Sequence, residues 1–154
     1  MTSGWVRTFA GVALAATVVA CSGETPEGDK MSVFTMAFGK CYNLATVADA
    51  EASQISDIRL IDCEQPHRFE VYHIHRLADA TFPGEAALTE AAENVCEANF
   101  ADYVGTAYDE SIYYYNFYTP TLQGWRQDND REIVCTVETE DGSPITGSVR
   151  GSKV

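Results

Sequence analysis

The fold is decided by the stretch EAALTEAAENVCEANFADY, residues 85–103. Its apolar positions recur every three or four residues, the spacing that places side chains on one face of an α-helix. The expected stripe consists of Leu88, Ala92, Val95, Asn99 and Tyr103, widened by Ala91, Cys96 and Phe100. Gly105 is expected to end the helix, because glycine readily adopts the left-handed conformation of a C-terminal cap. We therefore predict one long helix.

Segments with strand character lie on both sides of this helix. They are 37–44 (AFGKCYNL), 58–63 (IRLIDC), 68–77 (RFEVYHIHRL), 111–119 (SIYYYNFYT) and 133–139 (IVCTVET), with a weaker edge strand at 145–149. The residues of 68–77 alternate, which places Phe69, Val71, His73 and His75 on one face and their neighbours on the other. The segment PTLQGW, 120–125, is expected to be a loop. This order predicts an α+β fold, a small and mostly antiparallel sheet covered by one main helix.

Length and charge limit the class of protein. A chain of 154 residues holds one ordinary domain. It carries 10 Lys and Arg against 23 Asp and Glu, a formal net charge of -13. This excess of negative charge argues against a nucleic-acid partner, because binding to a phosphate backbone depends on cations. It argues equally against electrostatic docking on anionic lipid headgroups.

The N-terminal segment has the features of an export signal. Arg7 precedes an uncharged, largely apolar run, Thr8–Ala20, and Cys21 follows at once. This is the order of a secretory signal peptide. The tetrapeptide VVAC, 18–21, resembles the lipobox of bacterial lipoproteins, and the resemblance implies cleavage before Cys21 and attachment of a lipid to its sulfur. We therefore expect a signal peptide at 1–20, a lipidated Cys21 with a flexible polar tether over 21–36, and a folded domain over 37–151 on the extracytoplasmic side of the cell membrane.

The chain has five cysteines, of which the lipid would occupy one. The remaining four allow three disulfide pairings. We favour Cys41 with Cys63, because two strands flanking the turn at Pro66 bring them together, and Cys96 with Cys135, because the helix packs on the last strand. Export places these residues in an oxidising compartment, where disulfides persist. No pair has the C-x-x-C spacing of a zinc or redox site.

Several motifs together resemble a known family. They are GKCYNL (39–44), the pattern DC-x-x-PH-x-x-EV (62–71), Pro83-Gly84, the helix with Cys96, Phe100 and Tyr103, Pro120-Thr121, Trp125, Arg131, and the closing TGSVRG (146–151). This series resembles the septum formation domain of actinobacterial exported proteins, over roughly Phe38 to Gly151. The resemblance implies a disulfide-bonded module of the cell envelope, frequently lipidated or membrane-tethered, with a link to division septa. It implies no general catalytic activity.

The candidate metal ligands are few. His73 and His75 share a strand face, and His67 lies near them in sequence, although a histidine after Pro66 is better explained as a turn residue bonded to the backbone. The acidic residues Asp128, Asp130 and Glu132 start like a calcium loop but lack the required glycine and the distal glutamate. We expect no metal site and no cofactor.

Aromatic residues offer a candidate interaction surface. The run 112–118 carries aromatics on both strand faces, so one face packs beneath the helix and the other is either exposed for a partner or buried in a central strand. Tyr113, Tyr115, Phe117 and Trp125 are the candidate surface residues. Trp125 either extends this surface or covers the core at the Cys96–Cys135 bridge.

Motifs of enzymes are absent from the sequence. There is no G-x-S-x-G elbow, no Gly-rich phosphate loop and no H-E-x-x-H pair. We expect a non-catalytic envelope lipoprotein that contacts an envelope or division protein, or peptidoglycan. The alternative is a small-ligand carrier or a hydrolase, which requires a pocket holding two carboxylates or the His73–His75 pair.

Overall fold

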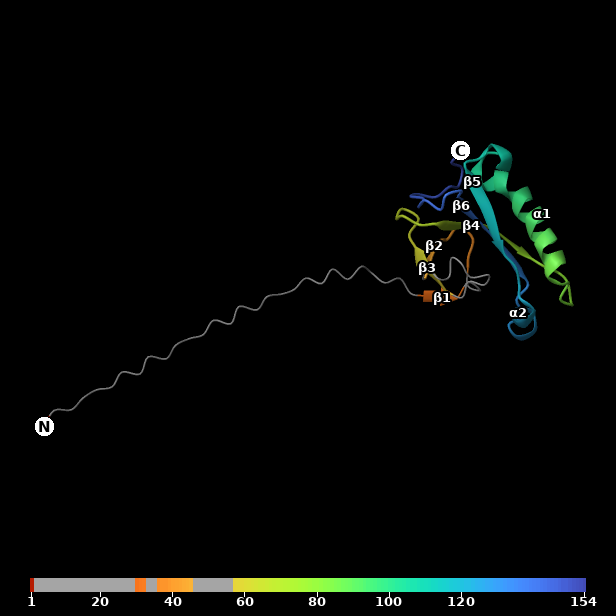
Figure 1. The fold of residues 1–154 in the computed structure, drawn as a ribbon, viewed down its shortest axis with the longest axis horizontal. Coiled ribbons are helices and arrows are strands. Elements are labelled where there is room, and N and C mark those ends of the chain that lie inside the picture. The colour runs from red at the N-terminus through yellow and green to blue at the C-terminus, as the bar shows by residue number, and fades with distance from the viewer. Residues whose placement is uncertain (2–29, 33–35, 46–56) are drawn as a thin grey trace.

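The computed structural model describes residues 1, 30–32, 36–45 and 57–154. Six strands form one sheet in the order β1-β3-β2-β4-β6-β5, and every adjacent pair is antiparallel (Figure 1). The strands are β1 (Lys30–Ser32), β2 (Cys41–Leu44), β3 (Asp57–Ile61), β4 (Phe69–Arg76), β5 (Tyr113–Tyr118) and β6 (Glu132–Thr139). The helices are α1 (Glu85–Val104), the short 3₁₀ helix η3 (Tyr108–Glu110) and α2 (Leu122–Gln127). The predicted α+β fold is confirmed.

Helix α1 matches the predicted helix to within one residue. It ends at Gly105, which has φ 90° and donates its backbone N–H to the carbonyl of Ala101 at 2.8 Å. The left-handed cap is therefore formed as expected. The buried face of α1 is slightly rotated from the predicted apolar stripe, because Val95 and Asn99 are only half-buried. The buried residues of α1 are Leu88, Ala92, Cys96, Phe100, Tyr103 and Val104.

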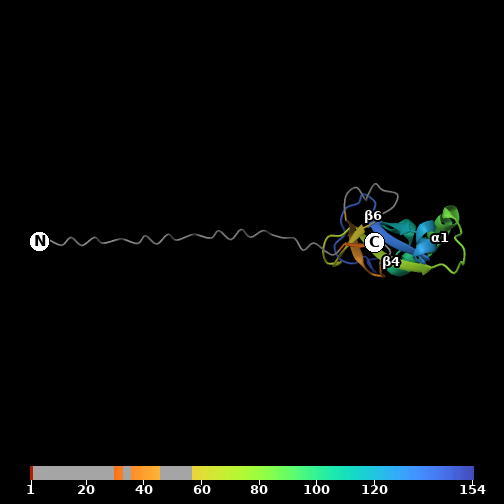
Figure 2. The same ribbon diagram turned by 90° about the horizontal axis from the view of Figure 1, so that it is seen from below.

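The core lies on both faces of the sheet. On one face, α1 packs over β4, β6 and β5, around Tyr72, Phe100, Cys135 and Val137. A second cluster, which includes Tyr42, Ile58, Phe69, Val71 and Val134, lies on the other face. In two views at right angles, α1 lies at the end of the domain away from β1 (Figures 1 and 2). The helix thus covers only the β4–β6–β5 half of the sheet.

A β-bulge in β4 overturns the predicted alternation of side chains. Val71 pairs with Thr136 and His73 pairs with Cys135, so the residue between them in β4 has no partner on β6. A bulge reverses the faces on which the following residues lie. Phe69 and Val71 join the second cluster, whereas His73 shares the α1 face with its partner Cys135. The expectation that all four odd-numbered residues share a face is therefore wrong beyond Val71.

The sheet also includes residues that we assigned to the tether. β1 pairs with β3, with Lys30 opposite Arg59 and Ser32 opposite Asp57, and Met36 is buried in the second cluster. The predicted end of the tether at residue 36 is thus too late. Strand pairing uses backbone groups, so a polar segment can complete an edge without any apolar alternation.

Two further segments differ from their predictions. Residues 120–125 include most of α2, which starts where the hydroxyl of Thr121 accepts a hydrogen bond from the backbone N–H of Gly124 at 3.0 Å. The expected edge strand at 145–149 is reduced to one bridge, in which Ile145 pairs with His67. Other backbone N–H groups of that segment donate hydrogen bonds to the turn after β3 and to the side chain of Glu70 instead.

Both disulfides form as predicted. Cys41–Cys63 links the start of β2 to the residue two places beyond β3, and Cys96–Cys135 links α1 to β6. The predicted signal peptide and the lipidation site Cys21 lie outside the described residues. Among the residues that are described, no helix has the length and apolarity to cross a membrane.

Candidate functional site

A buried carboxylate lies at the centre of the domain. Glu70 of β4 is 0% exposed. Its Oε1 atom accepts hydrogen bonds from the hydroxyls of Tyr103 and Ser148, each at 2.5 Å, and its Oε2 atom accepts one from the backbone N–H of Val149 at 2.8 Å. Burial of a charged group is strongly unfavourable unless its hydrogen bonds are satisfied. Glu70 therefore fixes the end of α1 and the C-terminal segment against β4.

The C-terminal segment reaches Glu70 because it is held at several points. His67 and Ile145 exchange backbone hydrogen bonds of 2.9 and 2.7 Å, and the N–H of Gly147 donates to the carbonyl of Cys63 at 2.7 Å. The N–H of Gly151 donates to the carbonyl of Tyr103 at 2.8 Å. The segment thus passes between the turn after β3 and the end of α1.

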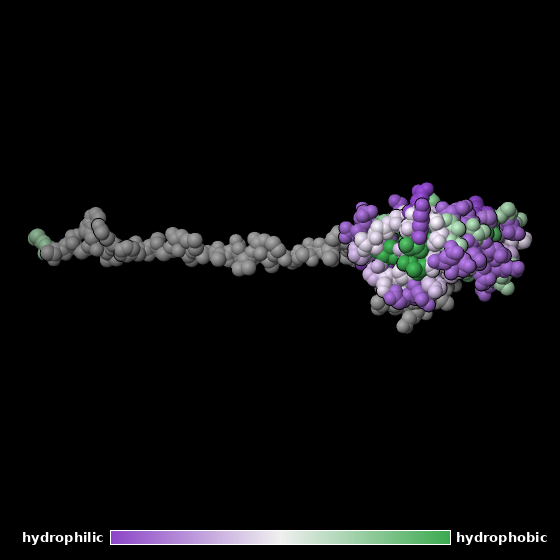
Figure 3. All heavy atoms as spheres, turned by 90° about the horizontal axis from the view of Figure 1, so that it is seen from above, coloured by the Kyte–Doolittle hydropathy of each residue, from purple (hydrophilic) through white to green (hydrophobic). Residues whose placement is uncertain are grey.

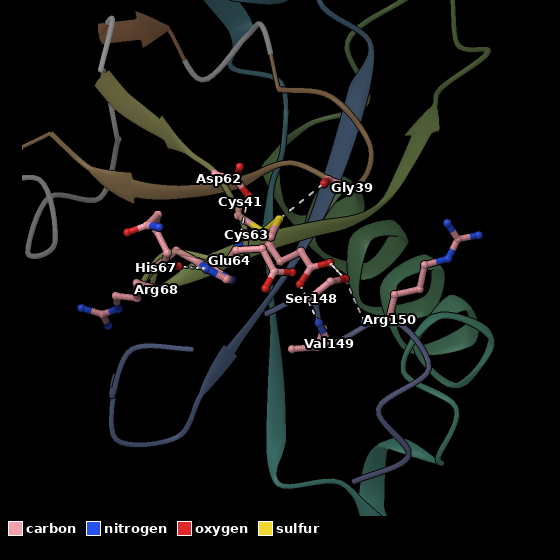
Figure 4. The surroundings of a disulfide bond; sticks show 12 residues. Gly39, Cys41, Asp62, Cys63, Glu64, His67, Arg68, Ser148, Val149 and Arg150 are labelled. Atoms are coloured by element: carbon pink, nitrogen blue, oxygen red, sulfur yellow. Dashed lines mark hydrogen bonds between the residues drawn. A yellow bond between two sulfur atoms is a disulfide. The ribbon is translucent and has the colours of Figure 1, made fainter. Parts of the chain in front are cut away.

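The Cys41–Cys63 disulfide, shown in Figure 4 with Ser148 and Val149 nearby, is close to this carboxylate. The two sulfur atoms and one oxygen of Glu70 all lie within 4.8 Å of one another. Such a trio can bind a metal only after reduction, because metal ligation requires thiolates. In the oxidised fold it is a disulfide next to a buried acid.

Tyr103 completes the site from the helix side. Burial raises the pKa of the Tyr103 hydroxyl, and the hydrogen bond and charge of Glu70 raise it further. The edge of the Tyr103 ring meets Phe38 at a centroid distance of 5.5 Å, and the guanidinium of Arg150 lies 5.9 Å from the Tyr103 ring. The hydroxyl therefore remains a neutral donor at ordinary pH.

The three histidines do not come together as a metal site. The rings of His73 and His75 stack 6.5 Å apart, and burial, followed by the charge of His75, lowers the pKa of His73. His67 is buried at the turn, where its Nδ1 atom lies 2.8 Å from the carbonyl of Gln65. The expectation of a turn histidine bonded to the backbone is confirmed. Within the described ranges, only Cys41, Cys63 and Glu70 form a group with metal-ligand spacing.

The acidic residues after α2 form a turn. The Oδ1 atom of Asp130 accepts the backbone N–H of Glu132 at 3.0 Å, and the carboxylate of Glu132 lies 3.6 Å from Arg76. These contacts stabilise the turn that leads into β6.

The predicted aromatic surface is not where the sequence placed it. Tyr113, Tyr115 and Phe117 are half-buried and pack against the cluster beneath α1. β5 is nevertheless an edge strand, so the alternative of a central strand buried on both faces is also wrong. The exposed large hydrophobic side chains of this run are Ile112, at 63%, and Tyr114, at 41%.

Trp125 is likewise absent from the surface. It is 5% exposed and meets Phe82 edge-on at 5.6 Å, with the guanidinium of Arg131 3.7 Å from its ring centroid. It is not part of the cluster around Cys96 and Cys135, so neither expectation for it holds. Trp125 borders an open hollow of about 450 Å³, whose other lining residues are Ala80, Thr81, Phe82, Leu122 and Arg126. This lining has neither the carboxylate pair nor the histidines that the hydrolase hypothesis requires.

Acidic residues line the exposed side of α1, the helix that packs on β5. Helix α1 has five exposed acidic residues and no Lys or Arg: Glu85, Glu90, Glu93, Glu97 and Asp102. The ring of Tyr108 lies 6.2 Å from that of Tyr114 and 4.6 Å from that of Tyr115. Burial raises the pKa of Tyr115, and the charges of Glu97, Tyr108 and Glu93 raise it further. We call Tyr108, Ile112 and Tyr114, with Glu93 and Glu97, the β5-edge surface.

Hydrophilic residues dominate the face of the domain shown in Figure 3, where a small hydrophobic patch lies near the centre. This agrees with the acidic composition of the chain.

Sequence reasoning missed Glu70 as a central residue. The available signal was a glutamate between Phe69 and Val71 in a strongly alternating strand that carries apolar residues on both faces. An acid at such a position requires a hydrogen-bonding partner from elsewhere in the chain.

Comparisons with known proteins agree with these features. The family model described as septum formation matches residues 38–153. The chain belongs to the septum formation family. This confirms the resemblance expected from the cysteine, proline and glycine motifs. The matched region of this chain includes α1, both disulfides and Glu70.

Two mycobacterial relatives carry the name "Putative lipoprotein LppN". The protein of Mycobacterium tuberculosis is 29% identical over 114 residues, and that of Mycobacterium bovis is 30% identical over 115 residues. Each alignment covers 73% of this chain and 61% of the relative, so the chain spans less than two thirds of their length. No solved structure matches the chain.

Proposed function

We propose that this septum formation protein is a lipid-anchored interaction module on the outer side of the cell membrane. The observation that carries the proposal is the pairing of all four cysteines of the domain, which leaves Cys21 of the VVAC motif as the fifth. Disulfides of this kind persist in exported proteins. The names of the two relatives support the same assignment. The acyl chains on Cys21 would provide the attachment to the membrane.

The β5-edge surface is the part of the domain proposed to bind a partner. Ile112 and Tyr114 are large and exposed. The face of a tyrosine ring can bind a cation, and it can also pack against apolar groups. Glu93 and Glu97 of α1, a helix with no Lys or Arg, add negative charge near Tyr115, the neighbour of Tyr114 in β5. A second copy would bring two acidic helices together, which is unfavourable for a chain of net charge -13. The proposed partner is therefore an envelope protein with an exposed segment rich in Lys or Arg.

The order of strands in the sheet supports a β5-edge surface that faces away from the N-terminal attachment point. β1 is the strand that follows the N-terminal segment, and β5 is at the opposite edge of the sheet. Six strands at a spacing of about 4.8 Å separate the two edges by about 24 Å. A domain attached through its N-terminus would thus present the β5-edge surface away from the attachment point.

Membrane fractionation of Cys21→Ser tests the anchor. The variant is expected in the soluble fraction and the unchanged protein in the membrane fraction, with metabolic labelling by palmitate only in the latter. Unchanged membrane association of the variant would contradict lipidation.

Affinity capture from envelope extracts tests the binding surface. Tyr114→Ala is expected to lower recovery of the partner about tenfold, the effect of losing about 1.4 kcal/mol at a contact residue. Leu122→Ala is the matched control, because Leu122 is 43% exposed but lies on α2. Equal recovery by both variants would contradict the assignment of the surface. Sedimentation with peptidoglycan in place of a protein partner would favour a wall ligand.

A further inference from the structure

The two disulfides differ in their access to solvent. Cys96 and Cys135 are both 0% exposed, beneath α1. In the other pair Cys41 is 1% exposed, whereas Cys63 is half-buried in the turn after β3. Thiol–disulfide exchange requires a thiolate to reach one sulfur atom from solvent. Among the four, Cys63 is the one cysteine that is not fully buried.

An attack on Cys63 would expel Cys41 next to Glu70. The sulfur of Cys41 then leaves as a thiolate within 4.8 Å of a carboxylate oxygen. Both Cys41 and Glu70 are buried, so water screens this repulsion poorly. A leaving thiolate that is destabilised leaves more slowly.

The hydrogen bonds of Glu70 indicate that it is ionised. Its two oxygens accept from Tyr103, Ser148 and Val149, the pattern of a carboxylate that acts only as an acceptor. Asp62 and Glu64 are exposed on either side of Cys63, and Arg150 lies near the other end of the site (Figure 4).

We propose that Cys63 is the site at which a dithiol enters the Cys41–Cys63 disulfide, and that Glu70 is a positioning residue whose charge retards the exchange. In the first step the thiolate of the dithiol bonds to the sulfur of Cys63, and the bond between Cys63 and Cys41 breaks with its electron pair going to Cys41. The second thiol of the reagent then displaces Cys63. The dithiol is oxidised to a disulfide, and Cys41 and Cys63 are each reduced to thiols after taking up a proton.

The test measures reduction of each disulfide separately. Full-length protein in detergent is treated with dithiothreitol, quenched with an alkylating reagent at intervals and analysed by peptide mass spectrometry. Glu70→Gln, which removes the charge but keeps the shape, is expected to accelerate reduction of Cys41–Cys63 at least about tenfold. Reduction of Cys96–Cys135 is expected to be unchanged, because both of its cysteines are fully buried beneath α1.

Tyr103→Phe is the matched control. It also removes a hydrogen bond from Glu70, but it leaves the carboxylate charge in place. Its Cys41–Cys63 reduction rate is expected to equal that of the unchanged protein. Equal acceleration in both variants, or equal acceleration of both disulfides, would assign the effect to loss of structure and overturn the role of Glu70.

A second measurement needs no substitution. The unchanged protein is exposed briefly to 2-mercaptoethanol, and the mixed disulfide is trapped in acid and mapped. The adduct is expected on Cys63. An adduct on Cys41 would overturn the proposed point of entry.

Discussion

The hydroxyl of Tyr103 donates a hydrogen bond of 2.5 Å to the Oε1 atom of Glu70, across 33 positions of sequence. This contact joins the last turn of α1 to β4, and both residues are buried. Hydrogen bonds to charged groups contribute about 1.5–3 kcal/mol to stability. Tyr103→Phe is therefore expected to lower the free energy of unfolding by about this amount, as measured by urea denaturation. A loss below about 0.5 kcal/mol would contradict a bond to a charged carboxylate.

Buried tyrosines predict alkaline unfolding. Burial raises the pKa of Tyr42, Tyr72, Tyr103 and Tyr118 above the ordinary value of about 10. Since the folded state holds these protons more tightly, their contribution to stability is complete below pH of about 10 and decreases as pH rises above it. We expect the urea midpoint to fall steeply above pH of about 10, with tyrosinate absorbance appearing together with unfolding. Tyrosinate absorbance from these residues in the folded protein would contradict this prediction.

Removal of the two disulfides is expected to have unequal effects. Cys96–Cys135 spans 39 residues and Cys41–Cys63 spans 22. The chain-entropy model gives losses of about 4 and about 3 kcal/mol. The double substitution Cys96→Ala with Cys135→Ala should also leave a cavity, because both side chains are fully buried. Denaturation of the two double variants checks the order, and a greater loss for Cys41→Ala with Cys63→Ala would reverse it.

Arg131 is expected to support Trp125. Its guanidinium lies over the indole ring at 3.7 Å and donates to the carbonyl of Trp125 at 2.9 Å. Arg131→Ala should lower the free energy of unfolding by about 1–2 kcal/mol and shift the fluorescence of Trp125 to the red. Trp5 lies in the predicted signal peptide, so Trp125 is the single tryptophan of the processed protein on which the measurement is made. Arg126→Ala, on the exposed side of α2, serves as the control.

Much of the fold follows from local patterns in the sequence. The bounds of α1 follow from its apolar spacing and from Gly105, and both disulfides follow from the order of strands and helix. The short helix α2 was missed because Gly124 weakens its propensity, although Thr121 provided a capping signal. β1 was missed because an edge strand can form without apolar alternation.

The sequence alone thus determined the α+β class, the long helix and the family, and it favoured the observed cysteine pairs among three possible pairings. Tertiary structure decided which face each side chain occupies after the bulge at Val71 and His73, that β5 is an edge strand, and that Glu70 meets Tyr103 and Ser148. The reason is physical. Periodicity and capping depend on neighbours within a few residues, whereas a bulge, a sheet edge and a buried hydrogen bond depend on partners that lie far away along the chain.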